Sequence, residues 1–222
     1  MKTSSKLLGT VACALAFVAA TSHAQTNPSG QTNATLPSGL LGRTYTSFNL
    51  GLEQIRHEVA NPTGFVADAD VNLPIDDGFD YHVDFGYQHA AKTGFKLRDT
   101  LINNGVTYYY RTHTVTPFLT AGFGYDWSRA TVRNVTSRNN HLSYGAATGV
   151  EVPMGTSTAV RLALDFDQSV RHPRAQTLNY QFSTNHWFND TVGASLGAIF
   201  RQGYSGAHDA TVYTAGMHFS FD

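Results

Sequence analysis

Three alternate residues, Asp80, His82 and Asp84, combine two carboxylates with an imidazole, a set that general acid–base chemistry can use. A second group of this kind, His208-Asp209, follows Ser205 in the short segment GYSG. A hydrolase would need such groups to converge at one rim, or its serine to lie on a strand-to-helix turn. The strands predicted below place the two groups at opposite ends of the fold and leave GYSG in a loop. The sequence therefore predicts no catalytic residue and no enzyme.

The residues that carry charge are positioned by a period-two alternation. In Phe79–His89, FDYHVDFGYQH, the odd positions are apolar or aromatic up to the final histidine, and the even positions are polar or glycine. Strict alternation predicts a β-strand. The pattern recurs about ten times, with almost no helical segment to cover the apolar faces. This favours an all-β fold: an antiparallel, up-and-down transmembrane β-barrel whose apolar side faces lipid.

Ten strands account for the alternation, and eight is the alternative count. The predicted strands are Arg43–Arg56, Phe65–Leu73, Phe79–His89, Lys96–Tyr110, Val115–Ala130, His141–Val152, Val160–Asp167, Leu178–His186, Val192–Arg201 and Tyr213–Phe221. Within the fourth strand, Asn103-Asn104-Gly105 is an alternative turn. The second strand is expected to stop at Pro74, which cannot donate to a strand ladder. Tight turns after the second, sixth and eighth strands lie on the same side as both termini, which predicts the periplasmic end. Longer connections at Arg129–Asn140, Ser169–Gln176 and Gln202–Asp209 would then be extracellular.

An export signal precedes the strands. Lys2 and Lys6 precede the apolar run Leu7–Ala20, and Ser22-His23-Ala24 offers small residues at the positions that a signal peptidase reads, so cleavage is predicted before Gln25. Residues 1–24 are therefore a predicted signal peptide. Residues 25–41, rich in Asn, Thr, Pro, Ser and Gly, are a predicted flexible periplasmic leader, and residues 42–222 the barrel.

Composition limits the remaining classes. The chain of 222 residues is 41% hydrophobic and 14% charged, with a mean hydropathy of -0.23, which excludes a bundle of transmembrane helices but not a barrel. Without the two lysines of the signal peptide, 13 Lys and Arg stand against 16 Asp and Glu, and this acidic balance gives no indication of a nucleic-acid partner. The single cysteine, Cys13, lies in the signal peptide, so the exported chain has no thiol chemistry.

The inward faces carry a mixed but acid-leaning set of charges. The residues expected to form a polar network in the lumen are Glu53, Asp70, Asp84, Asp126, Glu151, Arg161, Asp165 and Arg201. Since a charge away from bulk water must be paired, we expect Arg161 and Arg201 each to serve several carboxylates and to fill a narrow barrel. A narrow cation-preferring water path is the alternative. The ten histidines form no HxH or HxxxH pair on a strand face, so no metal and no cofactor are predicted.

Aromatic residues gather near the predicted strand ends, where amphipathic rings sit at the two membrane interfaces. The interface set is Tyr108, Tyr110, Tyr125, Trp127, Trp187, Tyr213, Phe219 and Phe221. These positions predict outer-membrane lipid as a partner. Arg129, Arg133 and Arg138 put positive charge on one extracellular connection, where they would either contact lipopolysaccharide phosphates or form an ordinary solvated loop.

Two segments carry a family resemblance. The segment PFLTAGFGY at Pro117–Tyr125 and the last strand, TVYTAGMHFSF at Thr211–Phe221, together with the export signal, resemble the small outer-membrane β-barrel proteins of Gram-negative bacteria, the opacity-type and OmpA-like barrels. The resemblance implies an outer-membrane location and a C-terminal strand read by the barrel-assembly machinery. It implies no shared catalytic residue. Here Asp222 follows Phe221, whereas the family usually ends on the aromatic residue.

The function expected from these features is a structural or surface-interaction role, with at most a narrow pore. Two alternatives stay open: an outer-membrane barrel enzyme of the omptin or lipase kind, and a soluble periplasmic β-barrel binding protein. The soluble protein would need its apolar faces to form an inner core and its polar faces to meet water.

Overall fold

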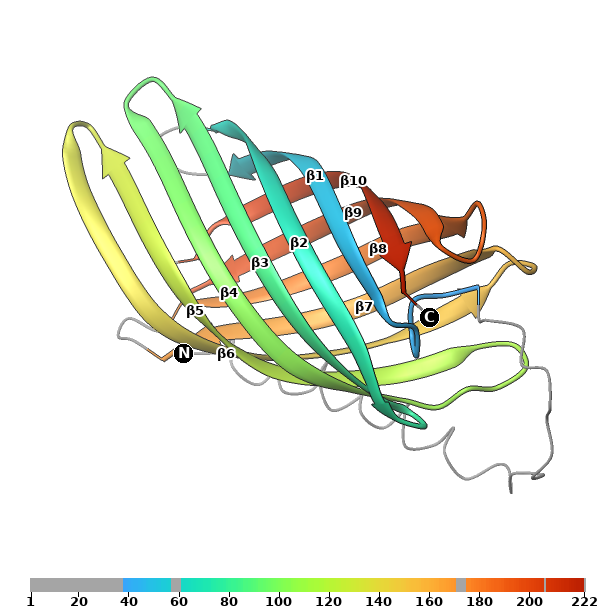
Figure 1. Cartoon of the computed structure of the whole chain (residues 1–222). Helices are drawn as coiled ribbons and strands as arrows, with labels where there is room; N and C mark the ends of the chain where they lie inside the picture. Colours follow the sequence, from blue (N-terminus) through green and yellow to red (C-terminus); the bar gives the residue numbers. More distant parts are fainter. Residues whose placement is uncertain (1–37, 57–60, 171–174, 206, 222) are drawn as a thin grey trace.

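The structure, a computed structural model, describes residues 38–56, 61–170, 175–205 and 207–221, which form ten strands. The strands are β1 (Tyr45–Arg56), β2 (Thr63–Asp76), β3 (Phe79–Lys92), β4 (Phe95–Tyr109), β5 (Thr116–Val132), β6 (Val135–Pro153), β7 (Thr158–Ser169), β8 (Gln176–Trp187), β9 (Val192–Tyr204) and β10 (Asp209–Ser220). Figure 1 shows them as one curved wall of tilted strands. In these ranges, no helix is long and apolar enough to cross a membrane.

Each strand pairs antiparallel with the next, and β1 pairs with β10, which closes the barrel. The closing seam runs from Tyr45 opposite Ser220 to Arg56 opposite Asp209. The predicted all-β, up-and-down barrel of ten strands is confirmed, and the alternative count of eight is wrong. Because the number of strands is even, the chain enters and leaves the barrel at the same end, which we take as periplasmic.

The barrel is apolar outside and polar inside. In β1, the outward side chains of Phe48, Leu50 and Leu52 are 55%, 68% and 72% exposed, whereas Ser47 and Glu53 on the other face are buried. The same exposure of large hydrophobic side chains continues on all the other strands. A wall of this kind buries its apolar surface only when lipid surrounds it. A soluble barrel would need the opposite arrangement.

The hairpin of β5 and β6 extends beyond the rest of the extracellular rim (Figure 1). Since β6 pairs with β7 only from Ser143 onward, Val135–His141 has β5 as its only paired strand among the described residues. Both turn residues, Arg133 and Asn134, have positive φ (47° and 70°), as a two-residue type I′ turn requires. The predicted loop Arg129–Asn140 is therefore wrong. Both faces of this segment are polar, so the alternation that marks a strand in lipid is missing.

Two smaller predictions are also corrected. β2 does not end at Pro74 but continues to Asp76, with a register shift between these two residues that accommodates the proline. β4 passes through Asn103–Gly105 without a turn, because all three residues pair with β3 and β5.

Candidate functional site

All eight residues predicted for the lumen lie on the inner face of the wall. The strand register gives them the phase opposite to the exposed apolar side chains: Glu53, Asp70, Asp84, Asp126, Glu151, Arg161, Asp165 and Arg201. They do not form one cluster. The structure distributes them over an extracellular layer, a central cavity and the periplasmic mouth, and each layer has its own partners.

The extracellular layer is centred on Glu53, whose side chain is fully buried. Arg201 Nη1 lies 3.6 Å from Glu53 Oε1, and Gln88 Nε2 donates to Glu53 Oε2 at 2.6 Å. Arg201 Nε also donates to Asn179 Oδ1 at 3.2 Å. Arg201 thus links β9 to β1 and β8, and Gln88 extends the contacts from Glu53 to β3, so the layer joins four strands across the inner face.

A second ion pair lies at the same end of the barrel, on β5 and β6. His141 Nε2 is 3.3 Å from Asp126 Oδ2, and the two residues are directly opposite in the strand register. The partner of this carboxylate is thus an imidazole and not one of the two lumen arginines. The alternation of faces did not predict this contact, because His141 was predicted only as the first residue of its strand.

The central layer surrounds a cavity of about 450 Å³. Its charged lining consists of Asp68, Asp70, Asp84, Asp165 and Asp167, together with Arg161. Amide side chains donate to several of these carboxyls: Asn49 Nδ2 to Asp68 at 2.7 Å, and Asn179 Nδ2 to Asp165 at 2.9 Å and to Asp167 at 3.2 Å. Asp70 and Asp84 are directly opposite each other on β2 and β3. The cavity is therefore strongly acidic, and its carboxyls are hydrogen-bonded to amide side chains more than they are paired with cations.

Arg161 does not serve several carboxylates as expected. Its guanidinium lies 4.1 Å from the centre of the Phe118 ring, a cation–π contact, and in the described part of the chain it has no carboxylate oxygen within 4.0 Å. Glu151, its direct neighbour across the β6–β7 pair, instead accepts a hydrogen bond from the backbone N–H of Leu40 at 3.1 Å. Arg201 does not serve several carboxylates either, since among the described carboxylates it contacts Glu53 alone.

Leu40 is one of four residues, Ser38–Leu41, that the sequence placed in the leader and not in the barrel. Ser38–Arg43, which we call the mouth segment, enters the periplasmic end of the lumen; Figure 1 shows it in blue beside the C-terminus. Leu41 is 4% exposed and packs against Tyr109 and Phe118 in the apolar cluster of the mouth. The last residues of the predicted leader are thus packed. Residues 1–37, with the predicted signal peptide and the rest of the leader, lie outside the described residues.

Polar contacts fix the mouth segment on both sides of Leu41. Gly42 N donates to Asp80 Oδ2 at 2.8 Å, and Arg111 Nη2 donates to the Leu41 carbonyl at 3.0 Å. Gly42 has a φ of 74°, so the chain can reverse there without the strain that a side chain would cause. The buried acids Asp80 and Glu151 had no evident partner in the sequence. Two buried carboxylates near one rim need hydrogen-bond donors, and this need was the one sign in the sequence that a further segment supplies backbone N–H groups there.

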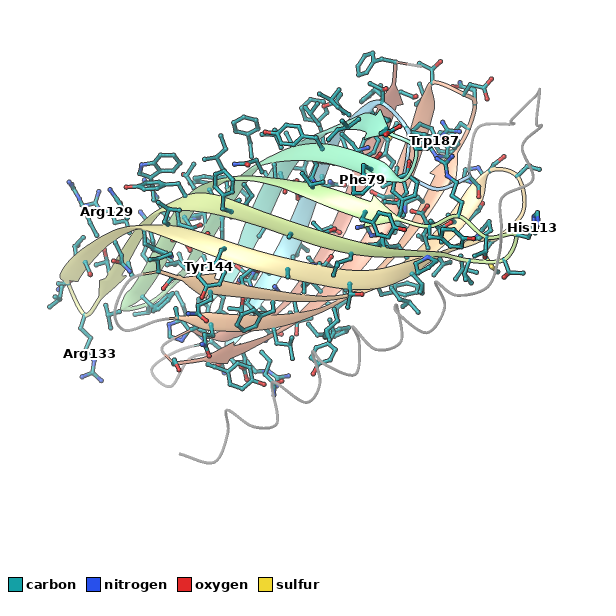
Figure 2. The ribbon with its side chains drawn as sticks, turned by 90° about the horizontal axis from the view of Figure 1, so that it is seen from below. Phe79, His113, Arg129, Arg133, Tyr144 and Trp187 are labelled. Atoms are coloured by element: carbon teal, nitrogen blue, oxygen red, sulfur yellow. The ribbon has the colours of Figure 1, made fainter. Side chains whose placement is uncertain are left out.

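Trp187 is wrongly predicted as a membrane-interface residue. It is 4% exposed and lies in the mouth, where its Nε1 donates to the Gly39 carbonyl at 3.4 Å and its ring lies 4.1 Å from the guanidinium carbon of Arg43. The sequence had placed this tryptophan in the turn after the eighth strand. In the structure β8 continues through Trp187, and the alternation of faces puts Trp187 on the inner face, two residues after Asn185. Figure 2 shows Trp187 at the end of the barrel opposite Arg129.

The other predicted interface aromatics lie outside the lumen or at strand ends. Tyr108, Tyr125, Trp127, Tyr213 and Phe219 have the outward phase, while Tyr110 and Phe221 follow the last residues of β4 and β10. The Tyr125 and Trp127 rings are 4.8 Å apart toward the extracellular end, and the Phe79 and Tyr108 rings are 5.0 Å apart near the periplasmic end. Two aromatic zones separated along the strands fit a membrane-spanning band.

Comparison with known proteins supports the fold. An outer-membrane channel from Pseudomonas putida F1 has a TM-score of 0.55 at 9% identity, over 86% of this chain and all of that chain. The Neisserial surface protein A has a TM-score of 0.47 at 12% identity, over 80% of this chain and 96% of that one. The chain has the fold of a bacterial outer-membrane β-barrel. No family model and no curated protein sequence matches this barrel.

The outer surface of this barrel fits a membrane location. A closed sheet has no free edge to satisfy in lipid, and the band of exposed Phe, Leu, Tyr and Val side chains matches a hydrocarbon surround. The protein is an integral barrel of the outer membrane. In the described residues, no group of three or more His, Cys, Asp or Glu side chains lies close enough to hold a metal ion.

Proposed function

We propose that this barrel has a structural and surface-interaction role and that its lumen provides at most a narrow pore. The observation that carries the proposal is the packed periplasmic mouth, where Leu41 packs with Tyr109 and Phe118 in one buried cluster. The extracellular half supports it, because Ile55 and neighbouring apolar side chains cluster on the inner face beside the Glu53–Arg201 pair. Side chains fill small barrels of this kind.

Conductance in planar bilayers tests this proposal. We expect the full mature protein to give no stable open-channel steps in symmetrical KCl, since the packed mouth segment should interrupt the water column through the lumen. Persistent ohmic steps from the unmodified protein would contradict a filled lumen. The matched variant is Leu41→Ala, which removes the apolar contact that holds the mouth segment and should produce a measurable leak.

A second candidate function, a narrow cation path, is favoured by the acidic lining of the central cavity. Five carboxyls face one arginine there, and fixed negative charge in a narrow path prefers cations. The leak of the Leu41→Ala variant should therefore reverse at a cation-selective potential in a KCl gradient. Adding Asp70→Asn and Asp84→Asn should weaken that selectivity. An anion-selective leak would argue against this second function.

We also propose that the barrel is not an enzyme. The two groups with acid–base character do not meet: Asp80, His82 and Asp84 are on the periplasmic half of β3, whereas His208 and Asp209 are at the extracellular start of β10. Asp209 Oδ1 accepts the backbone N–H of Gly203 at 2.9 Å, which gives its carboxylate a structural role in the β9–β10 connection.

A further inference from the structure

Three arginines stand side by side on the outer surface of the extended sheet. Arg98 on β4 is directly opposite Arg129 on β5, and Arg129 is directly opposite Arg138 on β6. We call these three residues the arginine row. All three are exposed. The sequence had grouped Arg129 and Arg138 with Arg133, but Arg133 lies in the hairpin turn, and Figure 2 shows it at the tip of the structure, apart from Arg129.

Such a row is unfavourable without a counter-charge. Directly opposite side chains on neighbouring strands have Cβ atoms about 5 Å apart, and like charges at that spacing destabilise a sheet. In the part of the chain that the structure describes, the ion pairs are Asp126 with His141 and Glu53 with Arg201, and neither neutralises the row. The nearest carboxyls in sequence, Asp99 and Asp126, are on the opposite, inner face of their strands. The anion that would neutralise the row is therefore not found among the described residues.

The height of the row identifies the source of that anion. One step of the register toward the membrane, the same outer face carries Thr100, Trp127 and Asn140, and the next step carries Ile102, Tyr125 and Leu142. Two residues along a strand span about 7 Å. The arginine row thus begins where the apolar and aromatic band ends, on the extracellular side, which is the level of lipid headgroups and not of the hydrocarbon.

A hollow beside the row can hold a phosphate-sized group. A cavity of about 180 Å³ is lined by Arg98, Arg129, Lys96 and Thr131. Lys96 and Thr131 are opposite each other in the register, one step above Arg98 and Arg129. Arginine binds phosphate oxygens through two parallel N–H donors, and lysine adds a point charge.

We propose that the arginine row, with Lys96 and Thr131, binds the phosphate groups of lipid A, the membrane anchor of lipopolysaccharide, in the outer leaflet. The lipid lies against the outer face of β4–β6 on the membrane side of the row. There its acyl chains contact Trp127 and Tyr125, and its phosphates reach the guanidinium groups. The site is independent of the lumen and does not depend on whether the barrel conducts ions.

The test compares binding of bisphosphorylated lipid A with binding of its dephosphorylated form, using the full mature barrel in a zwitterionic detergent. The variant is Arg98→Gln/Arg129→Gln/Arg138→Gln. Its matched control, Arg56→Gln/Lys92→Gln/Arg133→Gln, removes the same charge from exposed residues outside the row. We expect the variant to lose affinity for bisphosphorylated lipid A by on the order of 100-fold, about fivefold per arginine, and the control to lose less than tenfold. Binding should also weaken with added salt.

Three outcomes would overturn the proposal. The first is an equal loss of affinity for bisphosphorylated lipid A in both triple variants, and the second is equal affinity of the unmodified barrel for the bisphosphorylated and the dephosphorylated lipid. The third is a loss of heparin binding in the row variant while its binding of lipid A stays intact. The last would assign the row to a soluble polyanion. Folding gives an internal check, because removing the repulsion should leave the variant at least as resistant to thermal unfolding in lipid-free detergent as the unmodified barrel. A variant that unfolds earlier would show that the row stabilises the sheet by itself, which also contradicts the proposal.

Discussion

Leu50→Arg should lower the free energy of unfolding of the inserted barrel by about 2–4 kcal/mol, the cost of placing a guanidinium at the mid-depth of the lipid face. Leu50 is near the middle of β1 and is 68% exposed on the outer face. In water such a substitution on an exposed side chain would be nearly neutral. The large effect therefore depends on lipid contact, and equilibrium urea titrations in phospholipid vesicles measure it directly.

The matched control is Val135→Arg. Val135 is equally exposed, at 73%, but it lies beside the β5–β6 turn beyond the membrane band. We expect a change close to zero there. If the two arginine variants unfold at the same urea concentration as the unmodified protein, the outer face of β1 is in water, and the assignment of the membrane face is wrong.

Arg201→Met should cost on the order of 3 kcal/mol of stability, because it leaves the buried Glu53 carboxylate without its cation. Glu53 has a fully buried side chain and, among the described residues, would keep the hydrogen bond from Gln88 alone, whereas the side chain of Arg201 is 30% exposed. The loss should therefore come mainly from the Glu53 carboxylate, which stays buried without its cation, because the partly exposed Arg201 has only a small desolvation penalty to recover. Unfolding titrations in detergent provide the measurement.

A double-mutant cycle separates that cost from simple loss of packing. Glu53→Gln can still accept the hydrogen bond from Gln88 and carries no charge. The double variant Glu53→Gln/Arg201→Met should therefore recover most of the stability that Arg201→Met loses. Strictly additive losses would mean that the two side chains are not coupled and that the ion pair does not hold the extracellular layer together.

The sequence was informative wherever a strand has one face in lipid. Alternation around Phe79–His89, and its repetition, predicts the strand count, the closed barrel and the inner phase of every lumen charge, because a side-chain period of two leaves only two choices of face. It fails at β6, where residues beyond the membrane are polar on both faces. The alternation also led to the wrong position for Trp187, because it does not indicate whether a strand ends one residue earlier or later.

Cross-strand partners lie beyond what the alternation can give. The Asp126–His141 pair and the arginine row each depend on which residue of one strand stands opposite which residue of the next. That register is set by hairpin turns, among them the positive-φ pair Arg133-Asn134. The mouth segment was missed for a different reason: its hydrogen bonds with Glu151, Asp80 and Arg111 are made by backbone N–H and C=O groups, which every residue carries, so composition alone does not reveal them.

Tryptophan quenching by brominated lipids tests the central claim most directly, because Trp127 and Trp187 are the only two tryptophans of the chain and lie on opposite faces of its wall. Trp187→Phe leaves Trp127 as the reporter, and Trp127→Phe leaves Trp187. In vesicles with bromines near the headgroup end of the acyl chains, the emission of Trp127 should be strongly quenched. Emission from Trp187 should stay close to its level in unbrominated lipid. Equal quenching of both, or an unquenched Trp127, would contradict a barrel with its apolar face in lipid and its mouth packed from within.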